Sequence, residues 1–161
     1  MDAALYPGSF DPITYGHINI VERALDIFSQ VTVLVATNPQ KSYLFTPEEK
    51  VEMIRQCLRG WARVEVEHTE GLLVDYARRR QIRVAVRGLR AVTDFAGELA
   101  MALTNRTLWP EFDTVFLMTR SDYMYLSSSV VRQVAQLGGD ISKFVPPAVE
   151  QMLQARFGHG G

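Results

Sequence analysis

The sequence predicts an α/β fold, a five-stranded parallel sheet with helices on both faces. Two observations carry this prediction. Five short runs of apolar and β-branched residues alternate with segments in which apolar residues recur every three or four positions. The connections are short, so each strand is followed by a helix that packs back onto the sheet. The length of 161 residues predicts a single domain over residues 1–161.

The predicted strands are mostly apolar, which is typical of parallel strands covered on both faces. They span residues 3–6, 31–36, 64–67, 82–86 and 114–118. The run at 64–67 differs, because its apolar and charged side chains alternate. Ligands of such sheets bind beyond the carboxyl ends of the strands, where the strand order reverses. The loops that follow the strands are therefore expected to form the site.

Six amphipathic helices are predicted between and after the strands. They span about residues 15–28, 47–58, 72–80, 94–106, 127–136 and 146–153. The second has a strong start signal, because Thr46 and Glu49 can form a capping box around Pro47 at the first helical position. The fourth is predicted to turn one apolar face inward. That face consists of Phe95, Leu99, Ala102 and Leu103.

Composition excludes several classes of protein. The formal net charge of −1 argues against a general binder of nucleic acid or of membrane surfaces. The single Cys57 excludes an internal disulfide framework and fits a reducing compartment. We find no signal peptide and no apolar stretch near 18 residues, so the expectation is a cytoplasmic protein without a membrane span. The histidines, cysteine and acidic residues do not show the spacing of a protein metal site.

The string YPGSFDPITYGH at residues 6–17 is the most informative part of the chain. It joins a buried strand to the start of a helix, and free N–H groups at a helix N-terminus attract anions. Thr14 is a good N-cap, which places His17 at the third helical position, on the first turn. Gly8 and Gly16 remove side chains where a ligand would approach the backbone. The string therefore predicts a phosphate site beside His17.

Three other loops follow strands and should converge on the same edge of the sheet. Lys41 can bring a point charge to a phosphate, and Arg87 and Arg90 offer planar guanidinium groups on either side of Gly88. The serines at 127–129 can cap a helix and bind phosphate. Six arginines between positions 78 and 90 could instead bind RNA. Aromatic residues are not interleaved with them, and the net charge disfavours that interpretation.

These strings resemble the signatures of the nucleotidylyltransferase superfamily, and in detail those of its phosphopantetheine adenylyltransferase branch. The first signature is GSFDP followed by TYGH, the second is RGLRAVTDFAGE at 87–98, and the third is LSSSVVR at 126–132. The resemblance runs over about residues 3 to 157. Two positions depart from it: Leu126 replaces an isoleucine, and Gly97 stands where relatives commonly have a tyrosine. A glycine inside a helix costs about 1 kcal/mol relative to alanine, so the helix at 94–106 is expected to be looser.

The resemblance implies a Rossmann-like fold and the reaction of ATP with 4′-phosphopantetheine to give dephospho-coenzyme A and pyrophosphate, with Mg²⁺ carried by the ATP phosphates. It implies His17 as transition-state stabiliser, with Lys41 and Arg87 holding the attacking phosphate. The implied ATP-binding residues are Ser9, Phe10, His17, Gly88, Leu89, Arg90, Glu98, Tyr123, Met124, Tyr125, Leu126, Ser127, Ser128 and Ser129. The implied acceptor-binding residues are Ser9, Lys41, Leu73 and Arg87. It also implies a homohexamer and feedback inhibition by coenzyme A.

Three alternative functions can be compared with this one. A sister nucleotidylyltransferase would use nicotinamide mononucleotide or a small phosphorylated alcohol as acceptor, but the RGLR…DF…E string argues against it. A nucleotide-binding regulatory module without catalysis is disfavoured because His17, Lys41 and Arg87 are all present. A nicotinamide dehydrogenase is also disfavoured, since no GxGxxG follows the first strand.

Overall fold

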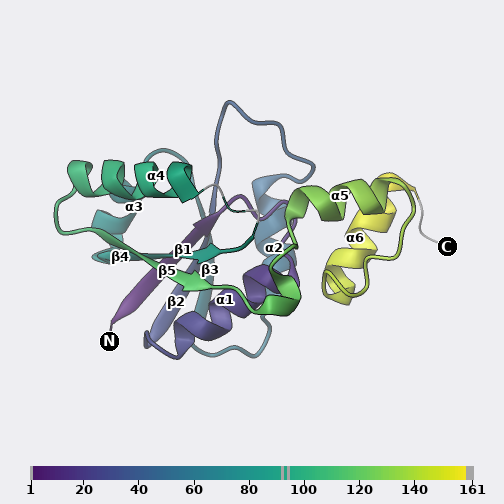
Figure 1. Ribbon diagram of the computed structural model, residues 1–161, viewed down its shortest axis with the longest axis horizontal. Helices are drawn as coiled ribbons and strands as arrows, with labels where there is room; N and C mark the ends of the chain where they lie inside the picture. Colours follow the sequence, from purple (N-terminus) through teal and green to yellow (C-terminus); the bar gives the residue numbers. More distant parts are fainter. Residues whose placement is uncertain (1, 92, 94, 159–161) are drawn as a thin grey trace.

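The computed structural model describes residues 2–91, 93 and 95–158. Its centre is a five-stranded, all-parallel sheet in the order β3-β2-β1-β4-β5 (Figure 1). The strands are β1 Ala3–Gly8, β2 Gln30–Ala36, β3 Val64–Thr69, β4 Val84–Leu89 and β5 Asp113–Met118. The predicted fold is confirmed. The strand order reverses between β1 and β4, because β1 pairs with β2 on one side and with β4 on the other.

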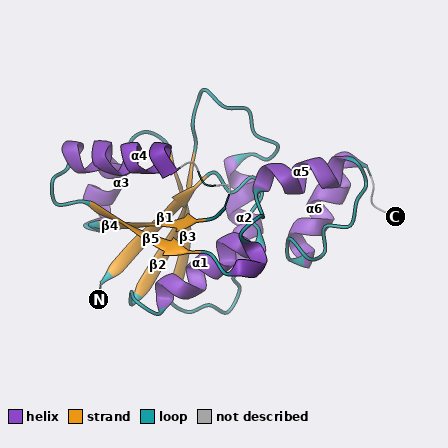
Figure 2. Cartoon of the chain, in the orientation of Figure 1, coloured by secondary structure: helices purple, strands orange, loops and turns teal. Residues whose placement is uncertain are grey.

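The helices alternate with the strands until β5 and then follow one another (Figure 2). They are α1 Tyr15–Leu25, α2 Pro47–Cys57, α3 Leu73–Arg80, α4 Phe95–Leu108, α5 Ser128–Gln136 and α6 Pro147–Phe157. Both predicted N-caps are confirmed: Thr14 and Thr46 each accept from the backbone N–H three residues on. A short 3₁₀ helix, η1 at Ser121–Tyr123, was not predicted, because a single turn leaves no periodic pattern.

Successive side chains of each strand point to opposite faces of the sheet and pack into two hydrophobic cores, one on each face. Ala4 and Tyr6 of β1 pack with α1, α2, α5 and α6, whereas Leu5 between them packs with α3. This alternation follows from the two-residue repeat of a strand and explains why β1 and β2 are apolar on both faces. The sheet thus holds the carboxyl ends of β1, β4 and β5 side by side, and the next loops begin there.

The prediction for the fourth helix is wrong in one respect. Phe95, Leu99 and Leu103 are 53%, 42% and 56% exposed, and Asn105 is the buried residue of α4. Ala102 is half-buried beside a cavity. Periodicity shows that a helix has an apolar face but does not say what covers that face, and here this chain leaves it uncovered. The predicted start at Asp94 lies outside the described residues. Gly97 does not break the helix, which runs without interruption from Phe95 to Leu108.

Candidate active site

A cavity of about 360 Å³ opens at the carboxyl ends of β1 and β4, where the strand order reverses. The position is the one expected for a parallel sheet of this kind. The loops that line it are distant in sequence: the β1–α1 turn, the loop after β2, the end of β4 and the start of α5. The lining includes eleven of the predicted site residues: Ser9, Phe10, His17, Lys41, Arg87, Gly88, Arg90, Glu98, Ser127, Ser128 and Ser129.

His17 is held in one orientation by the first turn of α1. Its Nδ1 accepts a hydrogen bond from the backbone N–H of Thr14 at 3.0 Å, which closes a capping box. That bond requires Nδ1 to be unprotonated, so the ring proton of the neutral imidazole is on Nε2. Burial, together with the charges of Arg90 and Arg87, lowers the pKa of His17 to about 3. His17 is therefore a neutral N–H donor at physiological pH.

The ring of Phe10 packs against the imidazole of His17. Its backbone has φ of 48°, its ring is 2% exposed, and the ring centroid lies 5.0 Å from that of His17 and 5.3 Å from that of Tyr6. A Cβ on Gly8 would come within 3.0 Å of the Phe10 ring, so the glycine leaves room for it. The strained turn at Gly8 and Phe10 thus places the Phe10 ring against the imidazole of His17 and fixes its position.

Arg87 and Glu98 form a bidentate ion pair across the floor of the site. Arg87 Nε and Nη2 lie 3.0 and 2.5 Å from the two carboxylate oxygens of Glu98, and Nη1 donates to the carbonyl of Pro7 at 2.6 Å. Burial lowers the pKa of the Arg87 guanidinium, but the hydrogen bonds and charge of Glu98 outweigh it and raise that pKa above its usual value. Within the described part of the chain, these bonds occupy three of the five N–H groups of Arg87 and leave two for a ligand.

Arg90 and three serines surround the other side of the cavity. The Arg90 guanidinium donates to the carbonyl of Leu126, which ties the end of β4 to the start of α5. Ser127 caps α5 by accepting from the N–H of Val130 at 3.2 Å. Ser128 Oγ donates to the carbonyl of Pro12 at 2.7 Å. The N-termini of α1 and α5 therefore meet at one point, and the free N–H groups of both favour an anion there.

A second cavity of about 600 Å³ adjoins the first. Ser9, Arg87 and Glu98 line both, so they form a shared wall between the two spaces. The rest of the second lining is more apolar and comes mainly from the end of β2 and its loop, the start of α3 and one face of α4, including Leu73 and Met101. Two ligands bound in these cavities would meet at Ser9 and Arg87.

Five predicted ATP-binding residues are not among the described residues that line the first cavity. They are Leu89, Tyr123, Met124, Tyr125 and Leu126. Leu126 is fully buried, Tyr125 is 54% exposed, and Leu89 pairs with Met118 in the sheet. Their contacts with ATP stay predictions.

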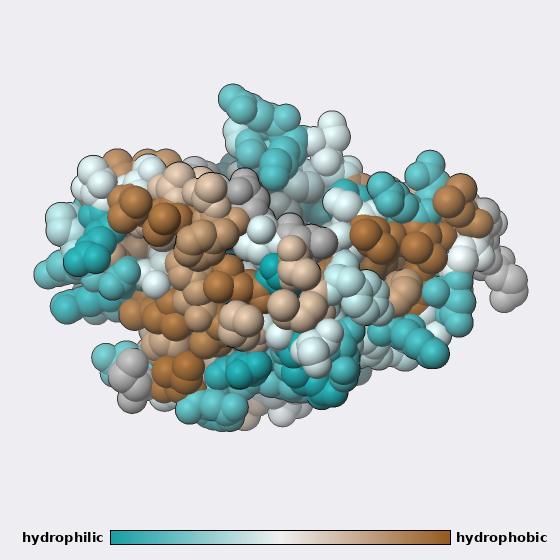
Figure 3. Space-filling model, in the orientation of Figure 1, coloured by the Kyte–Doolittle hydropathy of each residue, from teal (hydrophilic) through white to brown (hydrophobic). Residues whose placement is uncertain are grey.

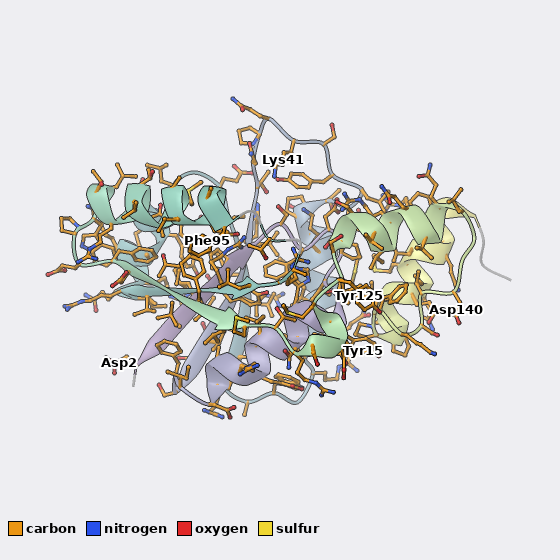
Figure 4. All side chains as sticks on the ribbon, viewed as in Figure 1. Asp2, Tyr15, Lys41, Phe95, Tyr125 and Asp140 are labelled. Atoms are coloured by element: carbon orange, nitrogen blue, oxygen red, sulfur yellow. The ribbon has the colours of Figure 1, made fainter. Side chains whose placement is uncertain are left out.

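Sequence reasoning missed several residues that build the site. The Asp11 carboxylate accepts the backbone N–H groups of Leu44 and Phe45 at 2.9 and 3.0 Å, and Arg132 donates to the Asp11 carbonyl at 2.5 Å. Asp11 thus ties the loop that carries Lys41 to the β1–α1 turn. Figure 4 shows Lys41 on that loop, which projects beyond the sheet. Asp11 and Arg132 lie inside the quoted signatures, so their positions could have drawn attention.

Lys50 is a further residue that sequence reasoning did not single out. It is fully buried, its Nζ donates to the carbonyl of Ser9 at 3.1 Å, and it lies 3.7 Å from the centroid of the Tyr43 ring. Burial lowers its pKa, and the charge of Asp11 partly opposes that shift. The available signal was its spacing, since Lys50, Ile54 and Leu58 fall on one face of the helix.

The arginines between 78 and 90 divide into two groups. Arg87 and Arg90 line the first cavity. Arg78 donates to the carbonyl of Leu108 at 2.7 Å, and Arg80 pairs with Glu65 and Glu67 at 2.7 and 2.8 Å. Arg78 and Arg80 therefore bond to the protein itself while Arg78 stays exposed, and neither lines the first cavity. Cys57 is half-buried, and burial raises its pKa to about 11, so it is an unreactive thiol at neutral pH.

A parallel sheet with two helix N-termini and cationic groups at its switch point has the features of a site for a phosphorylated ligand. Residues 5–134 match the model of the cytidylyltransferase-like family, which covers more than half of the chain. A solved structure of the same fold is that of a bifunctional NMN adenylyltransferase/ADP ribose pyrophosphatase from Francisella tularensis, with a TM-score of 0.72 and 14% identity over 96% of this chain. This chain spans 49% of that protein, and the likeness concerns the fold.

Curated relatives narrow the family further. A phosphopantetheine adenylyltransferase from Heliobacterium modesticaldum is 53% identical over 98% of this chain and 94% of its own length. One from Alkaliphilus metalliredigens is 51% identical over 97% of this chain and 99% of its own length. The chain belongs to the phosphopantetheine adenylyltransferase family, as its signatures predicted.

Proposed function

We propose that the protein transfers the adenylyl group of ATP to 4′-phosphopantetheine, giving dephospho-coenzyme A and pyrophosphate. The observation that carries the proposal is the pair of cavities that share the Ser9–Arg87–Glu98 wall. The first cavity, with two helix N-termini, suits a triphosphate. The second, with Leu73 and Met101, suits an uncharged, flexible arm. The nucleophile and the α-phosphate would meet at the wall.

The chemistry needs little from the protein beyond positioning and charge stabilisation. The attacking group is a phosphate monoester with a second pKa of about 6, so it is largely ionised at pH 7 and needs no general base. Two anions must be held in line while charge moves toward the leaving pyrophosphate. His17 Nε2–H donates to the α-phosphate of ATP. Lys41 and Arg87 hold the attacking phosphate of 4′-phosphopantetheine. Arg90 and Ser127–Ser129 hold the leaving pyrophosphate group.

Mg²⁺ would enter with the nucleotide. Within residues 2–91, 93 and 95–158 there is no group of three histidine, cysteine or acidic residues placed to hold a metal ion. Asp11, the acidic residue nearest the β1–α1 turn, already accepts two backbone N–H groups. Such a site fits an ion held mainly by phosphate oxygens and water, as Mg²⁺ often is. When bound, the ion neutralises charge on the triphosphate.

The proposed product resembles coenzyme A, which suggests how the enzyme is regulated. Dephospho-coenzyme A would span both cavities, and coenzyme A contains the same two parts. We therefore propose coenzyme A as a feedback inhibitor that competes for this site.

The helices of the described residues include none long and apolar enough to cross a membrane. We propose a cytoplasmic location, in keeping with the single cysteine.

Incubation with ATP, Mg²⁺ and a panel of phosphorylated acceptors tests the function directly. We expect 4′-phosphopantetheine to be adenylated much faster than nicotinamide mononucleotide or a small phosphorylated alcohol. Mass spectrometry of the product and release of pyrophosphate are the readouts. Faster adenylation of another acceptor would favour a sister activity, and ATP binding without any transfer would favour a regulatory module.

Two variants should separate the acceptor site from the nucleotide site. We expect Lys41→Ala to weaken binding of 4′-phosphopantetheine by about tenfold and to change ATP binding little, because the loop that carries Lys41 also lines the second cavity, at Thr37, Asn38 and Pro39. Arg90→Ala should do the reverse, since Arg90 faces the serines at the start of α5. Calorimetric titration of each variant with each ligand measures both effects. Equal weakening of both ligands by both variants would contradict this division.

The apolar face of α4 is the feature that bears on assembly. Figure 3 shows apolar residues gathered over α4 and β5, and the exposed ones on these elements include Phe95, Leu99, Leu103, Leu108 and Met118. A contiguous apolar surface on a folded protein marks an interaction site. We propose that further copies of the chain cover this face in a homohexamer.

One substitution on that face tests the assembly. Leu103 is 56% exposed and lines neither described cavity, so Leu103→Glu should leave the fold intact while placing a charge in the contact. We expect the variant to dissociate into smaller species in size-exclusion chromatography with light scattering. Leu137→Glu is the control, because Leu137 is 87% exposed at the end of α5 and should not affect assembly. A wild-type chain that elutes as a monomer at all concentrations would refute the hexamer.

A further inference from the structure

Thr119 carries a buried hydroxyl group that has no hydrogen-bond partner among the described residues. The residue follows β5, is 4% exposed and lines the first cavity. Among buried side-chain nitrogen and oxygen atoms of residues 2–91, 93 and 95–158, Thr119 Oγ1 is the one without a hydrogen-bond partner. Buried hydroxyls nearly always have a partner, so an unpaired one at the edge of a ligand cavity requires an explanation.

The backbone around Thr119 is fixed, so the chain cannot shift to satisfy the hydroxyl. Thr119 N–H donates to the carbonyl of Leu89 at 3.0 Å, and Arg120 N–H donates to Oδ1 of Asn19 at 2.9 Å. Arg23 also donates to the carbonyl of Met118, at 2.8 Å. Bonds from β4 and α1 thus hold both neighbours of Thr119. Since Oγ1 itself makes no hydrogen bond, rotation about the Cα–Cβ bond toward the cavity would break none.

The surroundings of Thr119 are apolar rather than cationic. A Cβ built on Gly88 would lie 3.5 Å from Thr119 Oγ1 and 2.8 Å from Cγ1 of Ile20, so these three residues meet at one point. Ile20 is one helical turn beyond His17 on α1. The hydroxyl therefore lies beside the Ile20 side chain and the glycine backbone, a surface that suits an uncharged part of a ligand.

We infer that the Thr119 hydroxyl binds the nucleoside part of ATP and contributes to recognition of the nucleotide. This inference rests on the proposed function, because it takes ATP as the occupant of the first cavity. The residue acts on ground-state binding, not on the transferred phosphate. ATP would supply the hydroxyl with a hydrogen-bond partner that the described residues do not provide.

The inference predicts opposite effects of one substitution on stability and on binding. Thr119→Val keeps the shape of the side chain and removes the hydroxyl. We expect the melting temperature of the free protein to stay the same or rise, and the Kd for Mg–ATP to rise by about tenfold. The Kd values for inorganic tripolyphosphate and for 4′-phosphopantetheine should not change. Calorimetry and thermal melts measure these quantities.

Two further variants make the test specific. Thr119→Ser keeps a hydroxyl and should bind ATP within about threefold of wild type. Thr69→Val removes a buried hydroxyl that already donates to the carbonyl of Glu70 and lines neither cavity, so it should lower the melting temperature and leave ATP binding unchanged.

Three outcomes would overturn the inference. Wild-type affinity for ATP in Thr119→Val would show that the hydroxyl makes no contact. An equal loss for ATP and tripolyphosphate would place the effect at the phosphates. A wild-type protein that fails to bind ATP at all would refute the proposed function, and this inference with it.

Discussion

We expect His17→Ala to lower kcat by about 100-fold or more, with little change in the Kd for ATP. The effect is large because Nε2–H is a fixed, neutral donor aimed at the cavity, and the loss of one such donor to developing charge typically costs this much. Ground-state binding depends more on Arg90, the serines and the helix N-termini, which the substitution leaves in place. Steady-state kinetics and calorimetric titration of the variant measure the two quantities.

A second variant separates catalysis from helix capping, because His17 has both roles. Glutamine at the third helical position can close a capping box with Thr14, so His17→Gln should keep the melting temperature near that of wild type while kcat stays low. Near wild-type turnover in either variant would refute the assigned role.

The pH dependence gives an independent check on His17. Since its folded pKa of about 3 lies below the ordinary value of 6.5, the protonated imidazole is disfavoured in the native state. The unfolded chain binds that proton first, so His17 should reduce stability as pH falls from 6.5 toward 3. In His17→Gln this part of the acid destabilisation should be absent from melting curves measured over that range.

We expect Arg87→Gln to reduce kcat/KM by about 10³-fold or more. Glutamine offers neither a charge nor a guanidinium to the attacking phosphate. It also leaves the Glu98 carboxylate, whose side chain is 18% exposed, without its partner at the shared wall of the two cavities. A largely buried charge that loses its partner is strongly unfavourable, and here it would also repel both substrates.

The double variant Arg87→Gln/Glu98→Gln distinguishes these two causes. It removes the unpaired carboxylate, so melting temperature should recover toward wild type, whereas activity should stay low because the cation is still missing. Arg83→Gln is the matched control, since Arg83 is exposed just before β4 and lies outside both cavities. If the double variant regained most of the activity, Arg87 would serve only to neutralise Glu98.

The sequence was sufficient for the fold because strands covered on both faces and capped helices leave local signals. Thr14, Thr46 and the apolar runs of β1 and β2 marked their elements correctly. Local pattern could not show pairings between distant residues. The bond from Lys50 to the Ser9 carbonyl joins positions 41 residues apart, and that between Arg87 and Glu98 depends on how α4 lies over β4.

The same limit explains the error in α4. Its apolar spacing was real, but a period in one chain says only that a face is apolar. The apolar spacing does not say whether the same chain or another molecule covers that face. The unpaired hydroxyl of Thr119 was equally out of reach, since a missing partner can be recognised only when every neighbour is placed.

The two edges of the sheet differ in a way that bears on aggregation. At one edge, β3 carries Glu65 and Glu67, both paired with Arg80, and charged side chains on an edge strand discourage pairing with a foreign strand. At the other edge, β5 reads DTVFLM and is partly exposed along its length beside the apolar face of α4. An edge strand of this kind is a site for pairing with a foreign strand, so the copies proposed to cover α4 would also shield β5 from misassembly.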